Sequence, residues 1–335
     1  MRQTAFFILL LLLTGCVKES PEAPATGPLL AVPPGFPAPV FPVDNAFSPE
    51  RWALGKKLFF DPVLSADSTV ACASCHRPAL AFADDRPFSP GVAGRPGARN
   101  APSLANVAYQ PYFTREGGVP TLEMQVLVPI QEHNEFGFNI LPIAERLRRD
   151  SSYVRMSQAA YQRAPDPFVI TRAIACFERS LISGRSRFDA WAYARNTAAL
   201  SASERRGMQL FFSEKTQCGA CHGGFNFTNY AFENNGLYVD YPDPGRYRLT
   251  ELESDRARFK IPSLRNVALT APYMHDGSLP SLEAVIEHYD SGGRAHPNKS
   301  PLVHPLGLSA REKSDLLAFL HSLTDTEFIT NPNFN

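Results

Sequence analysis

The sequence predicts a mainly α-helical protein built from two copies of one domain with long loops. Two segments, 282–289 and 310–323, carry apolar residues at helical spacing, and strand signals are sparse. Blocks of identical residues recur in the same order in both halves of the chain. The 335 residues suffice for two hydrophobic cores, and 30 prolines with 21 glycines predict extensive loops.

The N-terminus has the pattern of a bacterial export signal. Arg2 is followed by the apolar run 5–13, which is too short to span a bilayer. Small residues then precede Cys16, a sequence that resembles the lipobox of bacterial lipoproteins. We therefore expect a lipoprotein signal at 1–16 and a lipid on Cys16. In the alternative, Cys16 is incidental to an ordinary cleaved signal; both interpretations predict a periplasmic or other extracytoplasmic location.

Proline dominates the next segment, 17–43, and prevents regular hydrogen-bonded structure, so we expect an extended spacer there. We place a first domain at 44–197 and a second at 198–335. The 33 basic and 33 acidic residues cancel, which argues against a nucleic-acid partner and against electrostatic binding to a membrane. Membrane contact is expected only through the N-terminal lipid anchor.

Two short motifs predict the cofactor. CASCH at 72–76 and CGACH at 218–222 each have two cysteines separated by two residues and followed directly by histidine, the attachment pattern of c-type haem. Two thiols on one helical turn can bond to the haem vinyl groups while the histidine binds iron. The residues expected to hold two covalently bound haems are Cys72, Cys75 and His76, and Cys218, Cys221 and His222.

Other uses of the cysteines fit the spacing less well. A zinc site would need the two pairs to converge, but 146 residues separate Cys72 from Cys218, far more than the roughly 15–20 of a zinc ribbon. Cys176 lies in an apolar helical stretch, where an unpaired cysteine usually acts as a small buried hydrophobic residue. We assign it no function.

The internal repeat extends well beyond the haem motifs. A Gly-x-x-Leu-Phe-Phe element precedes each motif, at 55–60 and 207–212, and a Pro-Ser-Leu-x-Asn-Val-Ala block follows each, at 102–108 and 262–268. From this block onward the two halves keep one register, 160 positions apart (102 to 262). The chain is therefore a duplicated haem domain.

This register predicts a chemical difference between the two domains. Leu122 and Leu282 begin equivalent helices, and seven residues beyond them stand Pro129 and Tyr289. If these helices cross the open haem faces, Tyr289 offers a phenol oxygen to the second iron, whereas Pro129 cannot bind the first. One iron would be closed and the other open to peroxide. The rival ligands are Met274, His275 and His288, and without the repeat Tyr289 would be taken for an anchoring tyrosine.

These motifs resemble those of the bacterial di-haem cytochrome c peroxidases and MauG, over essentially all of the chain after the spacer. The likeness is carried by CGACHGGFNF, which begins at Cys218, and by IPSLRNVALTAPYMHDGSLPSLEAVIEHY, which begins at Ile261. Tyrosine rather than methionine at position 289 is similar to the MauG branch, including the methanobactin-associated di-haem enzymes. The resemblance implies two cytochrome c-like haem domains.

The resemblance also implies different roles for the two haems. The first is then the peroxide site, and the second, closed by Tyr289, passes electrons. In QVLVPIQEHNEFG, Gln125 matches the family's distal glutamine, Pro129 its non-ligating proline and Glu135 its catalytic glutamate. A carboxylate there can move the protons of peroxide. Glu132 is the competing choice for this acid, and a solvated loop acid is the alternative role for Glu135.

One calcium ion between the domains is a further implication of the resemblance. The matching ligands are Asn100, Thr270 and Pro272, the last two through backbone oxygens, which suit calcium. The family's tryptophan between the haems is missing, because the matching stretch YFTREGG places Thr114 or Arg115 there. We therefore expect electrons to take another route between the haems.

Three functions are compatible with this pattern. Our primary prediction is a peroxidase that reduces hydrogen peroxide with electrons from a small cytochrome or similar redox protein. The second is a MauG-like oxidase that uses peroxide to oxidise side chains of a partner protein, which Tyr289 favours. The third is a di-haem electron carrier without catalysis, against which the open first iron and Glu135 argue.

Overall fold

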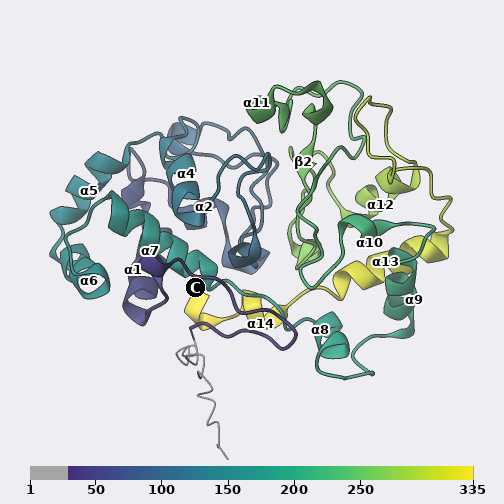
Figure 1. Ribbon diagram of the computed structural model, residues 1–335, viewed down its shortest axis with the longest axis horizontal. Helices are drawn as coiled ribbons and strands as arrows, with labels where there is room; N and C mark the ends of the chain where they lie inside the picture. Colours follow the sequence, from purple (N-terminus) through teal and green to yellow (C-terminus); the bar gives the residue numbers. More distant parts are fainter. Residues whose placement is uncertain (1–28, 335) are drawn as a thin grey trace, which may run out of the picture.

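The computed structural model describes residues 29–334 and confirms a mainly helical protein, which has two lobes (Figure 1). The first lobe contains α1 (Pro49–Phe60), α2 (Cys72–Cys75), α3 (Leu122–Gln125), α4 (Leu127–Gln131), α5 (Ile140–Arg148), α6 (Ser151–Tyr161) and α7 (Pro167–Arg179). The second contains α8 (Arg187–Ala192), α9 (Ala202–Phe211), α10 (Cys218–Cys221), α11 (Tyr247–Thr250), α12 (Leu282–Asp290) and α13 (Ala310–His321), and α14 (Thr326–Ile329) follows. β1 (Phe232–Glu233) pairs antiparallel with β2 (Phe259–Lys260).

The N-terminal predictions fall largely outside this range. The signal at 1–16, Cys16 and the start of the spacer lie outside the described residues. Between 29 and 334, no helix combines the length and the apolar character needed to cross a membrane.

One close helix crossing organises each lobe. α1 meets α7 at Gly55, and α9 meets α13 at Gly207. A Cβ atom on Gly55 would stand 1.9 Å from the carbonyl oxygen of Ala173, and one on Gly207 would stand 1.8 Å from that of Asp315. Only glycine allows such an approach, so the Gly-x-x-Leu-Phe-Phe repeat marks the same packing contact in both lobes.

Each lobe encloses its own aromatic core. In the first, Phe59 and Phe177 are fully buried, and the Trp52 indole donates to Ser180 Oγ (2.8 Å). In the second, Phe227 and Phe319 are fully buried. Cys176 is also fully buried on α7, as predicted for a small hydrophobic residue.

The domain boundary expected at 197/198 needs correction at α8. Phe188 of α8 packs in the core of the second lobe. Its neighbour Asp189 forms a buried ion pair with Arg265 (2.6 Å), which also belongs to the second lobe. α8 therefore packs with the second lobe, although the boundary predicted at 197/198 assigns it to the first domain. Burial of Phe188 in the second core stabilises this placement.

The end of the chain likewise departs from the expected domain 198–335. Phe328 of α14 and Phe334 are buried in the core of the first lobe. Their ring centroids lie 5.7 and 6.2 Å from that of Phe82. The last residues thus return to the first lobe, and Figure 1 shows α14 between the two lobes.

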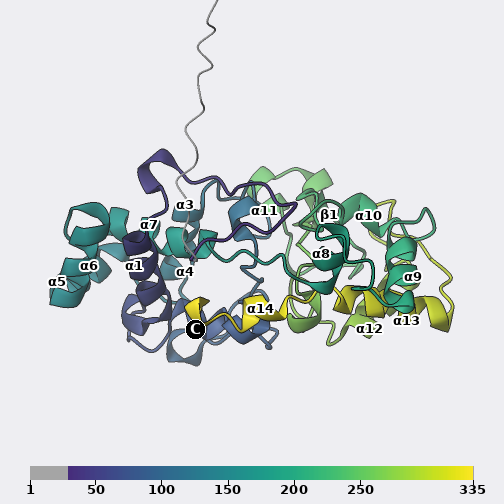
Figure 2. The same cartoon turned by 90° about the horizontal axis from the view of Figure 1, so that it is seen from below.

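The part of the predicted spacer that the structure describes packs against both lobes (Figure 2). Leu30 and Phe36 are buried, and the Phe36 ring lies 4.8 Å from that of Phe225 and 6.2 Å from that of Tyr109. Tyr109 Oη donates to the carbonyl of Pro37 (2.9 Å). From residue 29 onward this segment is a strap rather than a free spacer, because Leu30 and Phe36 are buried and Phe36 packs against rings of both lobes.

The close contact at Gly207 predicts that one added methyl group will lower the stability of the protein strongly. Gly207→Ala should destabilise the haem-loaded protein by about 1–3 kcal/mol, because a Cβ atom would overlap backbone. The measurement is the free energy of unfolding in denaturant. Gly97→Ala is the control, since its nearest neighbour would be Ser89 O at 3.5 Å, an ordinary contact. Equal free energies of unfolding for the Gly207→Ala and Gly97→Ala proteins would contradict the close helix contact at Gly207.

Candidate haem pockets

The first cysteine motif forms a single turn of helix that ends at the predicted iron ligand. α2 carries Cys72 and Cys75, and the His76 N–H donates to the carbonyl of Cys72 (2.9 Å). His76 Nδ1 donates to the carbonyl of Phe82 (2.9 Å). This bond fixes the ring and leaves Nε2 free for a metal. Burial lowers the pKa of His76, which favours the neutral ring that iron requires.

The second motif repeats this arrangement on α10. His222 Nδ1 donates to the carbonyl of Phe227 (3.1 Å), and burial lowers the pKa of this histidine too. Cys218 and Cys221 are not joined in a disulfide, nor are their counterparts on α2. Burial raises the pKa of all four thiols. Among residues 29–334, no three His, Cys, Asp or Glu side chains cluster as a metal site.

A helix break distinguishes the distal side of the first pocket. The second lobe has one continuous helix, α12, whereas the equivalent residues of the first lobe form α3 and α4, divided at Val126. Pro129 explains the break, because it lacks an N–H and its ring collides with the carbonyl four residues earlier, that of Gln125. Gln125 therefore ends α3 directly before the break.

Glu135 lies in the loop that follows α4. Its N–H donates to the carbonyl of Glu132 (3.0 Å), and its own carbonyl accepts from Val92 N (2.8 Å). Burial, and secondly the charge of Glu132, raise the pKa of Glu135. Its charge in turn raises the pKa of Cys72 and Cys75, so the carboxyl group lies near the first motif. Glu132 is exposed, which favours Glu135 as the acid of this pocket.

Tyr289 occupies the matching place in the second lobe. Burial raises the pKa of its phenol to about 12, and the charges of Cys218 and Cys221 act in the same direction. The phenol thus lies near the second motif. Two rival ligands contact Asn235, whose side chain also bonds the Tyr289 phenol: His288 Nε2 donates to Asn235 O (3.0 Å), and Met274 Sδ accepts from Asn235 Nδ2 (3.1 Å).

Three of the remaining predicted residues, Asn100, Arg115 and His275, lie at the junction between the lobes, where the Asn100 N–H donates to the carbonyl of His275 (2.9 Å). The third rival ligand, His275, is buried and stacks on Phe259 at 4.2 Å between centroids. Arg115 stands in register with His275, and Thr114 Oγ1 accepts from a backbone N–H (3.1 Å). Of the three residues predicted to bind calcium, Asn100 is buried and contacts Arg115 through both of its oxygens. Thr270 Oγ1 donates to Val267 O (3.1 Å), and Pro272 follows a cis peptide bond.

A second buried acid, Glu178, was not found from the sequence. It lies near the end of α7, and burial raises its pKa to about 8. Its charge also raises the pKa of Cys72. Gly55 contacts Phe177 and Gly207 contacts Phe319 at the two helix crossings, so Glu178 is equivalent to Leu320. An alignment of the α7 and α13 segments in the sequence would have shown that Glu178 stands where the second lobe has Leu320.

The residues present fit two haems. Gln125 Oε1, Arg258 Nε and Ser300 Oγ are buried and make no hydrogen bond to the described protein. A buried polar atom without a partner is unfavourable, so such atoms indicate that another group belongs beside them. The propionate groups of haem accept hydrogen bonds from guanidinium and hydroxyl donors of this kind.

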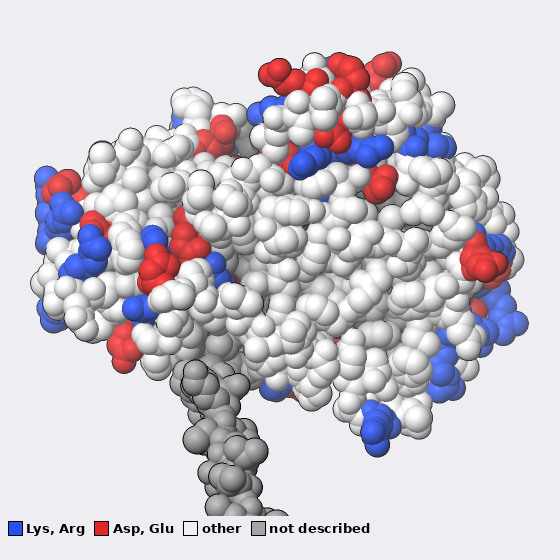
Figure 3. Space-filling view, in the orientation of Figure 1, with Lys and Arg blue, Asp and Glu red and all other residues white. Residues whose placement is uncertain are grey.

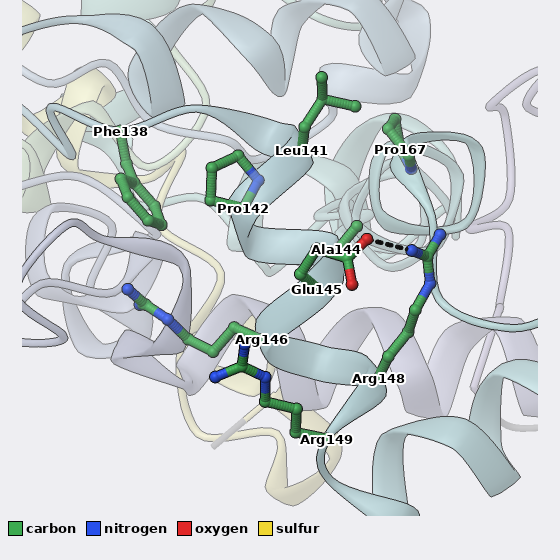
Figure 4. Close-up of a pocket in the computed structure, with 9 residues that line it drawn as sticks. All are labelled: Phe138, Leu141, Pro142, Ala144, Glu145, Arg146, Arg148, Arg149 and Pro167. Carbon is green, nitrogen blue, oxygen red and sulfur yellow. Dashed lines mark hydrogen bonds and ion pairs between the residues drawn. The ribbon is translucent and has the colours of Figure 1, made fainter.

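A separate hollow of about 640 Å³ on the surface of α5 is not part of this site (Figure 4). No residue of either haem motif lines it. Two of its three arginines have structural partners: Arg146 donates to the carbonyl of Val63 (2.7 Å), and Arg148 pairs with Glu145 (2.5 Å).

Comparison with known proteins assigns the chain to a class. The sequence pattern of the family described as di-haem cytochrome c peroxidase matches residues 49–197. The chain belongs to this family, and it is a peroxidase-type oxidoreductase with two c-type haems.

Individual relatives extend the match over both lobes. The methylamine utilization protein MauG of Methylorubrum extorquens is 37% identical over 286 residues, covering 84% of this chain and 80% of that protein. The cytochrome-c peroxidase IdrP1 of Pseudomonas sp. (strain SCT) is 36% identical, covering 89% and 87%. The crystal structure of a MauG-like protein associated with microbial copper homeostasis has a TM-score of 0.86 at 38% identity, covering 91% and 97%. These matches confirm the predicted family and fold.

Glu178 predicts a specific pH dependence of stability. Its folded pKa of about 8 exceeds its unfolded value near 4.5, so the unfolded state releases the proton first and stability falls as pH rises between these values. Relative to wild type, Glu178→Gln should gain roughly 2–4 kcal/mol between pH 5 and pH 8, measured by denaturant unfolding. The exposed Glu145→Gln is the control, and a Glu178→Gln variant that follows the wild-type pH profile would refute the assignment.

Proposed function

We propose that this chain reduces hydrogen peroxide in its first lobe and receives the electrons through its second. The haem bound by Cys72, Cys75 and His76 would supply an iron that reacts with peroxide. The observation that carries this assignment is the asymmetry of the repeat: a helix-breaking proline, Pro129, stands where the second lobe has Tyr289.

Two side chains would handle peroxide in the first pocket. Gln125 ends α3 with its Oε1 buried and unpartnered, and its amide can orient a polar ligand. Glu135 would take a proton from one peroxide oxygen and return it to the leaving oxygen. The raised pKa of Glu135 suits this exchange, because a buried carboxylate accepts a proton more readily than an exposed one.

In the second lobe, His222 and Tyr289 would bind the iron from opposite sides. A second ligand leaves no position for peroxide, so this haem is suited to passing electrons. The donor would be a small cytochrome or similar redox protein. On the side shown in Figure 3, a broad surface without charged residues crosses the middle, so charge does not mark a docking site there.

Oxidation of a partner protein is the second candidate function. Tyr289 favours it, as does the 37% identity to a protein named MauG. A decisive comparison adds peroxide to the purified di-haem protein with and without a reduced cytochrome. Rapid cytochrome oxidation supports the peroxidase, a long-lived spectral change without donor supports the oxidase, and no spectral response to peroxide rejects both.

We also propose export with a lipid on Cys16, supported by the signal-like sequence at 1–16. Recovery of the native protein from the soluble cytoplasmic fraction would refute this localisation.

Glu135 should be needed for the reaction with peroxide. Glu135→Gln is expected to retain both haem spectra but to react about 10²–10⁴-fold more slowly in stopped-flow measurements. Glu132→Gln is the matched control on the same turn: it should keep the rate and move the acid limb of the pH profile to lower pH, because the charge of Glu132 raises the pKa of Glu135. If Glu135→Gln and Glu132→Gln slowed the reaction with peroxide equally, Glu135 would not be the acid that moves the protons of peroxide.

Replacing Tyr289 should change the spectrum of the second haem and leave that of the first haem unchanged. Tyr289→Phe removes the phenol oxygen, so we expect one of the two haems to change its optical and electron paramagnetic resonance signals. His288→Gln is the control, because His288 Nε2 already donates to Asn235 O. A Tyr289→Phe protein with two unchanged haem signals would show that another residue binds this iron.

A further inference from the structure

The junction between the lobes is built by an exchange of backbone hydrogen bonds. The repeat register relates Asn100 to Lys260 and Arg115 to His275, each pair 160 positions apart. The Asn100 N–H donates to the carbonyl of His275 (2.9 Å), and the Lys260 N–H donates to the carbonyl of Arg115 (2.7 Å). Each lobe therefore gives the other one donor and one acceptor, from equivalent positions, at the edge where β2 faces the first lobe (Figure 1).

The side chain of Arg115 lies within this junction. Its Nη2 donates to both oxygens of Asn100, the carbonyl at 2.7 Å and Oδ1 at 3.2 Å. The other side-chain atom of Asn100, Nδ2, donates to the carbonyl of Arg86 (3.1 Å). Asn100 is 6% exposed, so these contacts are closed to bulk water. The guanidinium occupies the oxygens with which Asn100 would bind a metal ion.

The carboxylates around Arg115 all have protein partners, and Asp276 accepts from Tyr238 Oη (2.5 Å). Arg99 binds Asp243 with two hydrogen bonds (2.6 and 2.9 Å) and also pairs with Glu116, so both carboxylates are engaged. Lys260 Nζ donates to Gln110 Oε1 (2.6 Å) and to a backbone carbonyl. Burial, and secondly the charge of Arg115, lower the pKa of Lys260 to about 8.

A calcium ion fits this environment poorly. Calcium requires six to eight oxygen ligands and usually carboxylates among them. Here the one side-chain oxygen predicted to bind it accepts from Arg115, and a doubly charged ion would be repelled by Arg115 and Lys260 in a medium that screens charge weakly.

We infer that the guanidinium of Arg115 is the resident cation of the junction between the lobes, and that Asn100, Thr270 and Pro272 do not form a calcium site in this chain. The first lobe thus supplies the positive charge at the junction through its own side chain, while the backbone bonds of Asn100 and Lys260 join the two lobes. The inference concerns the junction alone and does not depend on which substrate the haems oxidise.

The first test uses the haem-loaded wild-type chain. After dialysis against calcium-free buffer, we expect substoichiometric calcium by elemental analysis, no heat of binding in a calcium titration, and the same unfolding temperature with EGTA as with calcium. One tightly bound equivalent, or an unfolding temperature or haem spectrum that EGTA changes, would overturn the inference. None of these measurements requires turnover, so they remain informative if the proposed function fails.

The second test changes the cation. Arg115→Gln should lower the unfolding temperature, whereas Arg115→Lys, which keeps the charge, should restore a large part of the loss. Arg149→Gln, an exposed change at the end of α5, should match wild type. If Arg115→Gln unfolds at the same temperature as Arg149→Gln, the guanidinium does not stabilise the junction and the inference fails.

Discussion

The close crossing of two helices at a glycine is the constraint on which this structure depends. At Gly55 and at Gly207 the backbone of one helix touches that of another, so neither pair can slide or rotate without a collision. The crossing fixes where the aromatic core of each lobe lies. Each haem motif follows its glycine helix after a short loop, so the crossing also determines where the cysteines and the iron-binding histidine are held.

Function arises where the two copies of this scaffold differ. At equivalent positions the first lobe has Pro129 where the second has Tyr289, and Glu178 where the second has Leu320. Proline breaks a helix and cannot bind iron, and the extra acid places a second buried carboxyl group near the first motif. Similar packing thus supports two pockets with different linings, and this difference is the basis of the open first haem and the closed second haem that we propose.

Local patterns predicted much of this from the sequence. The haem motifs, the repeat register and the pairing of Pro129 with Tyr289 depend on spacing along the chain, and the family and the helical fold were confirmed. The strap before α1, the placement of α8 and the return of the last residues depend instead on which distant core buries an apolar side chain. No local pattern encodes that choice. From the sequence, Arg115 was identified only as a residue at the position of the family's tryptophan. Its hydrogen bonds to Asn100 join residues 15 positions apart in loops, and no sequence pattern predicts such a contact.

The return of Phe328 and Phe334 to the first lobe has a consequence for the order in which the molecule is made. Both rings pack against Phe82, whose carbonyl holds His76, the predicted axial ligand of the first haem. Phe328 and Phe334 follow the whole second lobe in the sequence, so the wall behind His76 is completed only after that lobe has been synthesised. The second lobe can therefore fold before the first, and a chain cut short before Phe328 lacks part of the support of the predicted haem ligand His76.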